Sequence, residues 1–563
     1  MRRFTVLLVF LLAASFLPAA EQSGVQYRRL PVKEYRDKMK AGWIGQIAGV
    51  CWGAPTEFHY CGTIIPEDKM PKWTPDMINN AFGQDDLYVE MTFLRTMEEH
   101  GLNVSLRQAG IDFANSGYPL WHANMAGRRN LRAGIAPPDS SHPKFNEHAD
   151  DIDYQIEADY SGLIAPGMPN IAIELGDKFG RLMNYGDGVY GGIFVGAMYS
   201  EAFFEDDMVE IIETALKAIP ADCQYAEMIR DMLKWYEEEP NDWLKTWDKI
   251  EAKYQDNPEY RKFSCDPGNF NIDAKINGAY ILMGMLYGKK DLDQTIIIST
   301  RCGQDSDCNP SNAAGVLFTT LGFSNLPPRF SEKLDETKVF SHTAYNFPAL
   351  IDVCEKLTRQ AIEKEGGFVE KNAQGEEVFV IPVKAIKLGP TMKTYEPGPI
   401  AGSEFTEAER KLIRFRDFRN IQEAMDHYFP GWIISDCGPD MNPGIREIYG
   451  LQNVLLTHPK EREVPCVLSR EFDVPKQGLC ELHLVVTHND TGNWDLIVKV
   501  DGKEIRKQTI GKEQDNPGSR WTNVDIDLTP YAGKKIKLEL LNQPTGWSNE
   551  AGYWSKIDIR RAN

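Results

Sequence analysis

The chain has 563 residues and a formal net charge of −20 at pH 7, with 42% hydrophobic and 26% charged residues. Because this length exceeds what one compact core accommodates, we expect two or three domains of ordinary globular composition. The negative charge argues against a nucleic-acid or anionic-membrane partner, and it is compatible with a neutral substrate or with an anionic one bound through metal.

Residues 1–20 have the composition of a secretory signal peptide. Arg2-Arg3 forms a positive start, an apolar run follows over residues 4–17, and Ala19-Ala20 provides small residues for cleavage. The apolar run is short for a membrane span, and no comparable run follows it. We therefore predict a secreted or periplasmic protein without a membrane span after signal removal, the alternative being an uncleaved anchor.

Residues 21–365 are predicted to form one all-α domain. Glycines recur there at intervals of three and four residues in two stretches, which places them along one face of a helix. They are Gly42, Gly45, Gly49 and Gly53 in the first stretch and Gly188, Gly192 and Gly196 in the second. Small residues in such a row let two helix backbones approach closely, so we interpret most of these glycines as packing positions.

Two acidic loops, far apart in the sequence, each precede a stretch with helical periodicity. The first contains Asp85 and Asp86, and the second contains Asp305 and Asp307. At a helix N-terminus the dipole and the unpaired N–H groups tolerate negative charge. Four carboxylates brought together would repel one another unless a hard divalent cation neutralised them. For either loop alone a solvated capping cluster is the alternative, and an EF-hand calcium loop starting at Asp305 is excluded by its spacing.

A polar segment at residues 130–170 lies between predicted helices. It carries five acids within ten residues, interrupted by Tyr154 and other apolar side chains. The acids are Asp150, Asp151, Asp153, Glu157 and Asp159. One interpretation is a solvated acidic face, and the other is a substrate-facing loop, because aromatic planes beside carboxylates suit sugar rings.

Residues 366–430 are predicted to be a connector. Within it, Phe368–Lys371 and Val378–Ile381 flank a turn sequence and indicate a hairpin. One more helix is expected near residues 406–428.

Residues 431–563 change to a periodicity of two. Short alternating runs, such as Trp494 to Val500 before an Asp501-Gly502 turn, are typical of strands joined by hairpins. We predict a β-sandwich there, so the fold class is an all-α domain followed by a C-terminal β-sandwich. Its tryptophans either fill the core or stack on sugars, and they are Trp494, Trp521, Trp547 and Trp554.

Three motifs together resemble the ADP-ribosylglycohydrolase family, which consists of all-α hydrolases with a paired magnesium site. The stretch from Gly45 to Gly53, followed by Glu57, is similar to the family's opening glycine-rich helix with its metal-directed glutamate. Gln84-Asp85-Asp86 is placed like the family's Thr-Asp-Asp, and Gly303-Gln304-Asp305-Ser306-Asp307-Cys308 is placed like its Gly-x-Asp-x-Asp-Thr. The resemblance covers residues 40–325.

The resemblance implies a metal site and a reaction. The implied cofactor is Mg²⁺, or alternatively Ca²⁺, as one or two ions. The implied ligands are Asp85, Asp86, Asp305, Asp307 and Gln84, with Glu57 as a ligand or as a gate on the substrate side. A metal pair can hold sugar hydroxyls and polarise an attacking water while a glycosidic bond is hydrolysed. The implied substrate is ADP-ribosylated, and an extracellular glycan is the alternative.

Further candidates come from the polar segment and from residues 162–167, which are similar to a family loop. One of Asp151, Asp153 or Glu157 is a candidate general acid or base. The substrate-binding candidates are Gly162, Gly167, Asp187 and Tyr154. Asp187 and Glu90 are second-choice acid–base candidates, although Glu90 is more simply explained as an exposed helical residue.

The chain departs from the family pattern at three positions. Gln84 and Cys308 stand where the family has threonine, and Val50 stands where it has aspartate. Because sulfur is a poor ligand for Mg²⁺, one metal position is expected to differ. These departures favour a second hypothesis, a non-catalytic carbohydrate-binding protein built on a degenerate hydrolase domain. The sandwich, which from Trp521 to Trp554 is similar to galactose-binding-like carbohydrate modules, would tether such a protein to glycan.

Overall fold

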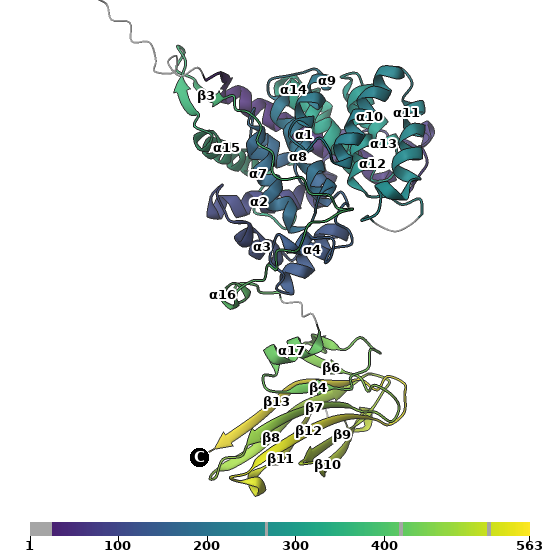
Figure 1. Cartoon of the computed structure of the whole chain (residues 1–563), viewed down its shortest axis with the longest axis vertical. Helices are drawn as coiled ribbons and strands as arrows, with labels where there is room; N and C mark the ends of the chain where they lie inside the picture. The colour runs from purple at the N-terminus through teal and green to yellow at the C-terminus, as the bar shows by residue number, and fades with distance from the viewer. Residues whose placement is uncertain (1–24, 265–267, 416–419, 515–518, 563) are drawn as a thin grey trace, which may run out of the picture. The chain divides into compact units, whose positions relative to one another are not determined.

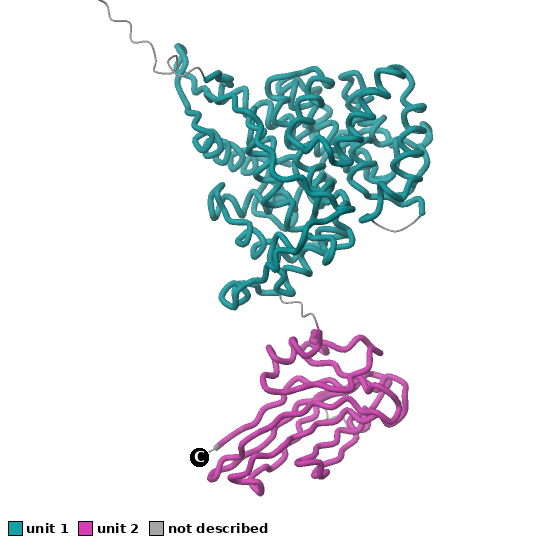
Figure 2. The backbone as a smooth tube through the Cα atoms, viewed as in Figure 1, with its two compact units in different colours: residues 1–415 teal, residues 416–563 magenta. Residues whose placement is uncertain are grey.

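The computed structural model describes residues 25–264, 268–415, 420–514 and 519–562, so the expected signal segment lies outside the described residues. The chain divides into two compact units, unit 1 at residues 1–415 and unit 2 at residues 416–563 (Figure 2). Within the described ranges, none of the helices combines the length and apolarity needed to cross a membrane.

Unit 1 is built almost entirely from helices (Figure 1). In its first half these are α1 (Val32–Gly53), α2 (Asp85–His100), α3 (Leu106–Ala114), α4 (His122–Arg132), α5 (Asp153–Ile156), α6 (Asp159–Leu163), α7 (Pro169–Phe179) and α8 (Asp187–Ala202). In its second half they are α9 (Met208–Leu216), α10 (Gln224–Glu238), α11 (Trp243–Ile250), α12 (Ala274–Tyr287), α13 (Leu292–Arg301), α14 (Cys308–Leu321), α15 (Phe347–Lys364) and α16 (Glu407–Arg410). The all-α prediction for this part of the chain is confirmed.

Helix α1 packs against α14 through the first predicted row of glycines. A Cβ atom on Gly49 would lie 2.4 Å from the carbonyl oxygen of Pro310, and one on Gly53 would lie 2.0 Å from that of Ser306. Real Cβ atoms do not approach a backbone oxygen so closely, so only glycine allows this contact. The packing brings the end of α1 beside the second acidic loop.

A three-stranded antiparallel sheet joins the two ends of the helical region. The predicted hairpin is present as β2 (Phe368–Lys371) and β3 (Glu377–Pro382), and β1 (Tyr27–Pro31) pairs with the free edge of β3. The sequence did not predict β1, because only Leu30 of its five residues is buried and no alternation marks it. The hairpin therefore belongs to the compact body of unit 1.

The prediction of a single helix near residues 406–428 is wrong. The structure has two short helices, α16 and α17 (Ile421–Tyr428), and they belong to different units. Each has its own N-cap. The side chain of Thr406 accepts a hydrogen bond from the N–H of Glu409, and the side chain of Asn420 accepts one from the N–H of Glu423. Two separate caps start two helices instead of one.

The polar segment at residues 130–170 is folded into the core. All five of its acids are buried, with exposed fractions between 0 and 5% for Asp150, Asp151, Asp153, Glu157 and Asp159. The interpretation as a solvated acidic face is therefore wrong. Donors from distant parts of the chain stabilise these carboxyl groups, as the side-chain amide of Asn312 does for Asp159 at 2.7 Å.

The described part of unit 2 is a β-sandwich of two antiparallel five-stranded sheets, with the orders β10-β9-β12-β7-β4 and β11-β8-β13-β6-β5. The strands are β4 (Ile433–Ser435), β5 (Gly444–Ile448), β6 (Leu451–Thr457), β7 (Cys466–Asp473), β8 (Leu479–His488), β9 (Trp494–Val500), β10 (Lys503–Ile510), β11 (Thr522–Asp527), β12 (Lys535–Pro544) and β13 (Gly552–Ala562). Trp494 and Trp554 are buried in its core with ring centroids 5.0 Å apart, whereas Trp521 and Trp547 are half-buried. The predicted β-sandwich is confirmed.

Candidate functional site

Unit 1 contains a cavity of about 610 Å³ that is lined by both acidic and aromatic residues. Its acidic and thiol lining consists of Glu57, Asp85, Asp153, Asp305 and Cys308. Its aromatic and imidazole lining consists of Phe58, Tyr88, Trp121, His122, Phe270 and His342. These residues come from segments that are far apart in the sequence, so the cavity is a product of the tertiary fold.

The two predicted acidic loops meet at this cavity. Asp85 and Asp86 form the first turn of α2, and Asp307 is the residue immediately before α14. The side-chain ligand atoms of Asp86, Asp307 and Cys308 lie within 4.8 Å of one another. The same is true of Glu57, Asp305 and Asp307. We call these the inner group and the outer group, and they share Asp307.

Backbone and side-chain contacts hold the second acidic loop in place. The carbonyl of Gln304 accepts a hydrogen bond from the N–H of Phe58 at 3.1 Å, which fixes the loop beside Glu57. The Gln304 side chain accepts one from the N–H of Asn271 at 2.9 Å. The hydroxyl groups of Ser306 and Thr56 lie 2.9 Å apart. The loop and the end of α1 thus form one unit that positions the outer group.

Burial and mutual repulsion raise the pKa values of these acids. Burial is the largest cause for Asp86 and Asp305, and the nearby charge of Asp307 raises both pKa values further. Burial, then Asp307 and Asp85, raise the pKa of Glu57 to about 8. Oδ1 of Asp86 and Oδ1 of Asp305 are buried without a hydrogen-bond partner. Oxygen atoms of this kind fit a divalent cation, which would supply both the missing partner and the opposite charge.

Gln84 is the residue that precedes α2 and lines the cavity next to Asp85. Its side chain carries an amide oxygen, which is a suitable ligand type for a hard cation. Of the six candidates for the metal site, Glu57, Gln84, Asp85 and Asp305 line the cavity. Asp86 and Asp307 lie behind the lining, within 4.8 Å of ligand atoms of lining residues.

Asp153 lines the cavity at the start of α5. Its carboxylate accepts hydrogen bonds of 3.2 Å from the N–H groups of Ala123 and Asn124 in the first turn of α4. Burial, followed by the charge of Asp151, raises the pKa of Asp153 to about 8. Glu157 lies behind it, fully buried, and accepts a hydrogen bond of 2.8 Å from the side-chain amide of Asn124. Asp153 is thus held firmly in a site where it retains a proton at neutral pH.

The third acid–base candidate, Asp151, lies outside the cavity lining. It is fully buried, and its Oδ2 is 3.0 Å from Nδ1 of His148, whose pKa is raised chiefly by this hydrogen bond. Its neighbour in the fold is Asp273, with which it forms an isolated β-bridge. The position of Asp151 supports the segment that carries Asp153.

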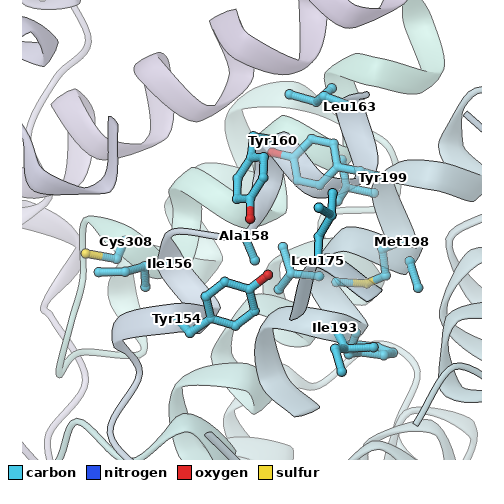
Figure 3. Close-up of a cluster of buried hydrophobic side chains, with 14 of the residues drawn as sticks. Tyr154, Ile156, Ala158, Tyr160, Leu163, Leu175, Ile193, Met198, Tyr199 and Cys308 are labelled. Carbon is cyan, nitrogen blue, oxygen red and sulfur yellow. The ribbon is translucent and has the colours of Figure 1, made fainter. Parts of the chain in front are cut away.

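The four substrate-binding candidates also lie away from the cavity lining. Tyr154 is fully buried in a cluster with Tyr160 and Tyr199 (Figure 3). A Cβ atom on Gly162 would lie 2.1 Å from the carbonyl oxygen of Gly196 in α8, so Gly162 is a packing position. Gly167 has a φ of +64° in a turn.

Asp187, the last of the four, begins α8, where its carboxylate accepts a hydrogen bond of 2.8 Å from the N–H of Tyr225. Burial is the largest of the causes that raise the pKa of this carboxyl group from 3.8 to about 6. The prediction that Glu90 is an exposed helical residue is wrong. It is fully buried, because its carboxylate accepts hydrogen bonds from the side chain of Gln46 and the N–H of Tyr160.

The aromatic walls are the part of the site that sequence reasoning missed. Trp121 is 56% exposed, and its indole Nε1 donates a hydrogen bond of 2.9 Å to Oδ2 of Asp85. The rings of Phe58 and Phe270 pack edge to face with their centroids 4.9 Å apart. These residues follow no periodic pattern, so only the assembled fold shows that they face one cavity.

Comparisons with known proteins were made for the whole chain. No curated protein matches it. A solved structure named "ADP-ribosylglycohydrolase-related protein complex" is 14% identical, with 58% of this chain and 99% of that chain covered and a TM-score of 0.37. A family 35 carbohydrate binding module from Clostridium thermocellum is 12% identical, with 23% and 92% covered and a TM-score of 0.17. A Podospora anserina GH26-CBM35 β-(1,4)-mannanase is 11% identical, with 24% and 28% covered and a TM-score of 0.16.

The sequence model of one protein family matches the chain over residues 31–365. This span covers more than half of the chain, includes both acidic loops and Glu57, and lies within unit 1. The chain belongs to the ADP-ribosylglycohydrolase family.

Proposed function

We propose that unit 1 is a cation-dependent hydrolase of glycosidic bonds. The observation that carries this proposal is the convergence of the inner and outer groups, which share Asp307 and contribute Glu57, Asp305 and Cys308 to the cavity lining. Asp85, Asp86, Asp305, Asp307 and Glu57 would hold one or two divalent ions, with the side chain of Gln84 as a further ligand. A bound ion supplies charge stabilisation and a more acidic water molecule at the site of attack.

Asp153 is the proposed general acid. Because its pKa is about 8, it carries a proton at neutral pH that it can donate to the leaving group. The N–H groups of Ala123 and Asn124 hold its carboxyl group in a fixed orientation. Glu57, which follows the end of α1, would orient the attacking water, and the carboxylates around the sugar would stabilise the oxocarbenium-like transition state.

The lining of the cavity favours a sugar substrate over a phosphate-rich one. Among the described residues that line it, none is a lysine or an arginine, which are the usual partners of phosphate. Aromatic planes such as Phe270 and Trp121 are suited to the apolar faces of sugar rings. We therefore place a glycan first and an ADP-ribosyl group second. Export by the N-terminal signal remains a prediction from the sequence, and it is compatible with an extracellular glycan.

The test combines metal binding with substrate release. Asp305→Asn with Asp307→Asn should reduce divalent-ion affinity by about 100-fold or more and abolish hydrolysis. The matched control is Asp68→Asn with Asp76→Asn, two exposed acids of unit 1 that should change neither property. Substrates are screened as a panel of glycans and ADP-ribosylated proteins. If the wild-type protein binds glycan without ever releasing sugar or ADP-ribose, the non-catalytic alternative is the correct one.

A further inference from the structure

The inner group contains a thiol in addition to its carboxylates. Cys308 is the first residue of α14, is only 5% exposed, and lines the cavity. Its Sγ lies 3.3 Å from Oδ2 of Asp86 and 3.7 Å from Oδ1 of Asp307. Figure 3 draws it, together with Ile156, among the side chains of a buried hydrophobic cluster. A sulfur atom thus faces the same small space as two buried carboxylates.

We propose that the inner group Asp86–Asp307–Cys308 binds a borderline divalent ion of the Zn²⁺ class, with Cys308 as a direct sulfur ligand. The outer group Glu57–Asp305–Asp307, which contains only oxygen ligands, takes a harder ion such as Mg²⁺. This inference rests on the proposed cation site of unit 1 and specifies which ion each half of it selects.

The separations between the ligand atoms fit this assignment. A tetrahedral Zn²⁺ has Zn–S bonds of about 2.3 Å and Zn–O bonds of about 2.1 Å, which places a sulfur and an oxygen ligand about 3.6 Å apart. The observed separations of Cys308 Sγ from the two carboxylate oxygens, 3.3 and 3.7 Å, bracket that value. Each sulfur–carboxylate pair is therefore spaced for one ion, and ligand atoms of all three side chains lie within 4.8 Å of one another.

A buried carboxylate oxygen without a hydrogen-bond partner also supports an ion at the inner group. Oδ1 of Asp86 has no hydrogen-bond partner although the residue is fully buried. The Cys308 thiol now donates to Oδ2 of the same carboxylate. When an ion binds, the thiol proton leaves to solvent and a sulfur lone pair forms the new bond, so the ion replaces that proton as the partner of Asp86.

Ligand chemistry decides between the two ion classes. Mg²⁺ prefers oxygen ligands in octahedral geometry and seldom accepts sulfur, whereas Zn²⁺ and Co²⁺ bind thiolate and carboxylate together. With one sulfur among three protein ligands, the inner group matches the second class. The oxygen-only outer group matches the first.

The experiment uses full-length protein that has been freed of metal and kept in a phosphine reductant. Co²⁺ serves as a spectroscopic substitute for Zn²⁺, because a Co²⁺–thiolate bond gives a near-ultraviolet charge-transfer band that oxygen ligands do not give. The variants are Cys308→Ser and Cys308→Thr, and the matched control is Cys354→Ser, which changes another fully buried cysteine of unit 1. Calorimetry with Zn²⁺ alone and with Mg²⁺ alone measures the affinities.

We expect the band in the wild type and in Cys354→Ser and its loss in both Cys308 variants. Zn²⁺ affinity should fall by about 10-fold or more in Cys308→Thr, since even the loss of an outer partner of a metal ligand costs that much. Mg²⁺ affinity should not fall. If one Cys308 variant does not fold, the spectrum of the other, compared with that of Cys354→Ser, still decides the question.

The inference is overturned if Co²⁺ binds to the wild type without the band, or if Cys308→Thr binds Zn²⁺ as tightly as the wild type. In either case the proposed hydrolase stands as long as Mg²⁺ supports substrate release by Cys308→Thr. If no divalent ion binds to the wild type, both the inference and the proposed cation dependence are wrong.

Discussion

Trp121 and Asp85, which both line the cavity, are joined by a hydrogen bond of 2.9 Å from the indole Nε1 to Oδ2. The bond, together with backbone hydrogen bonds, lowers the pKa of a carboxyl group that burial otherwise raises. The exposed ring plane of Trp121 therefore has two roles, since it can contact a substrate while it orients a proposed metal ligand.

The two roles of Trp121 can be separated by substitution. Trp121→Phe removes the donor and keeps a ring, whereas Trp121→Ala removes both. We expect Trp121→Phe to weaken divalent-ion binding with little change in KM. Trp121→Ala should in addition raise KM about fivefold, which corresponds to the loss of a contact of about 1 kcal/mol. Steady-state kinetics and calorimetry check both expectations, and equal KM values for the two variants would show that the ring does not contact substrate.

Asp153 should govern the alkaline limb of the activity profile. As a general acid with a pKa of about 8, it loses its proton above that pH, so activity should fall there. Asp153→Asn should lower kcat by about 10²- to 10⁴-fold and remove the limb. Rates measured as a function of pH for the wild type, Asp153→Asn and the exposed control Asp76→Asn test this. A limb that persists in Asp153→Asn would assign it to another group.

The same carboxyl group also links stability to pH. Its pKa is raised from 3.8 in the unfolded chain to about 8 in the folded one, so the folded state binds the proton more tightly. Its contribution to stability is therefore fully present below about pH 4 and is lost as pH rises toward about 8. The unfolding midpoint of Asp153→Asn, relative to the wild type, should rise steadily across this range. A difference that stays constant with pH would contradict the raised pKa.

The close contact between α1 and the second acidic loop gives a steric prediction. Gly53→Ala would place a Cβ atom 2.0 Å from the carbonyl oxygen of Ser306, so α1 and the loop must separate. We expect a loss of about 1–3 kcal/mol in the free energy of unfolding, as for other overpacked sites, together with weaker ion binding. Gly117→Ala is the control, because no heavy atom lies within 4 Å of its Cβ position. If both variants are equally stable, the contact does not position the loop.

A buried ion cluster behind the cavity gives a further prediction. Lys275 is 1% exposed, and its Nζ lies 3.1 Å from Asp273 and 3.3 Å from Asp150. Adjacent to this cluster, the N–H of Ile152 donates to the carbonyl of Ile272, and both isoleucines line the cavity. Lys275→Met leaves buried carboxylates without their cation and should cost about 3–5 kcal/mol.

The control for that variant is Lys290→Met, which removes the exposed pair with Asp206 and should cost at most about 1 kcal/mol. Adding Asp150→Asn and Asp273→Asn to Lys275→Met should restore part of the lost stability, because the unpaired charges are then gone. Thermal or denaturant unfolding measures all of these variants. A failure of the added substitutions to restore any stability would mean that packing, and not charge, dominates at Lys275.

The sequence predicted those features whose physical cause is local. Asp85–Asp86 and Asp305–Asp307 stand at helix starts that a short stretch already specifies, and the hairpin at β2 and β3 follows from its turn. The glycine row of α1 was likewise predictable, because the spacing of the glycines defines a helix face.

Features that depend on partners far away in the sequence were not predictable. Glu90 is buried because Gln46 and Tyr160 supply its hydrogen bonds, and nothing near position 90 indicates them. The acids of residues 130–170 lie in the core for the same reason, as Asp153 does beside the first turn of α4. The aromatic wall has no periodic pattern, since Trp121 and Phe270 come from unrelated segments.

The pairing of β1 with β3 brings together two segments that lie on either side of the helical region in the sequence. Tyr27 lies opposite Pro382 and Pro31 opposite Val378, so the opening strand has no partner until almost the whole helical region has been synthesised. A nascent chain must therefore keep this segment unpaired throughout most of translation, and contacts of such long range slow folding. A truncation or protease cut that removes residues after Gln26 would delete β1. The edge of β3 would then be exposed and could pair with a strand of another molecule.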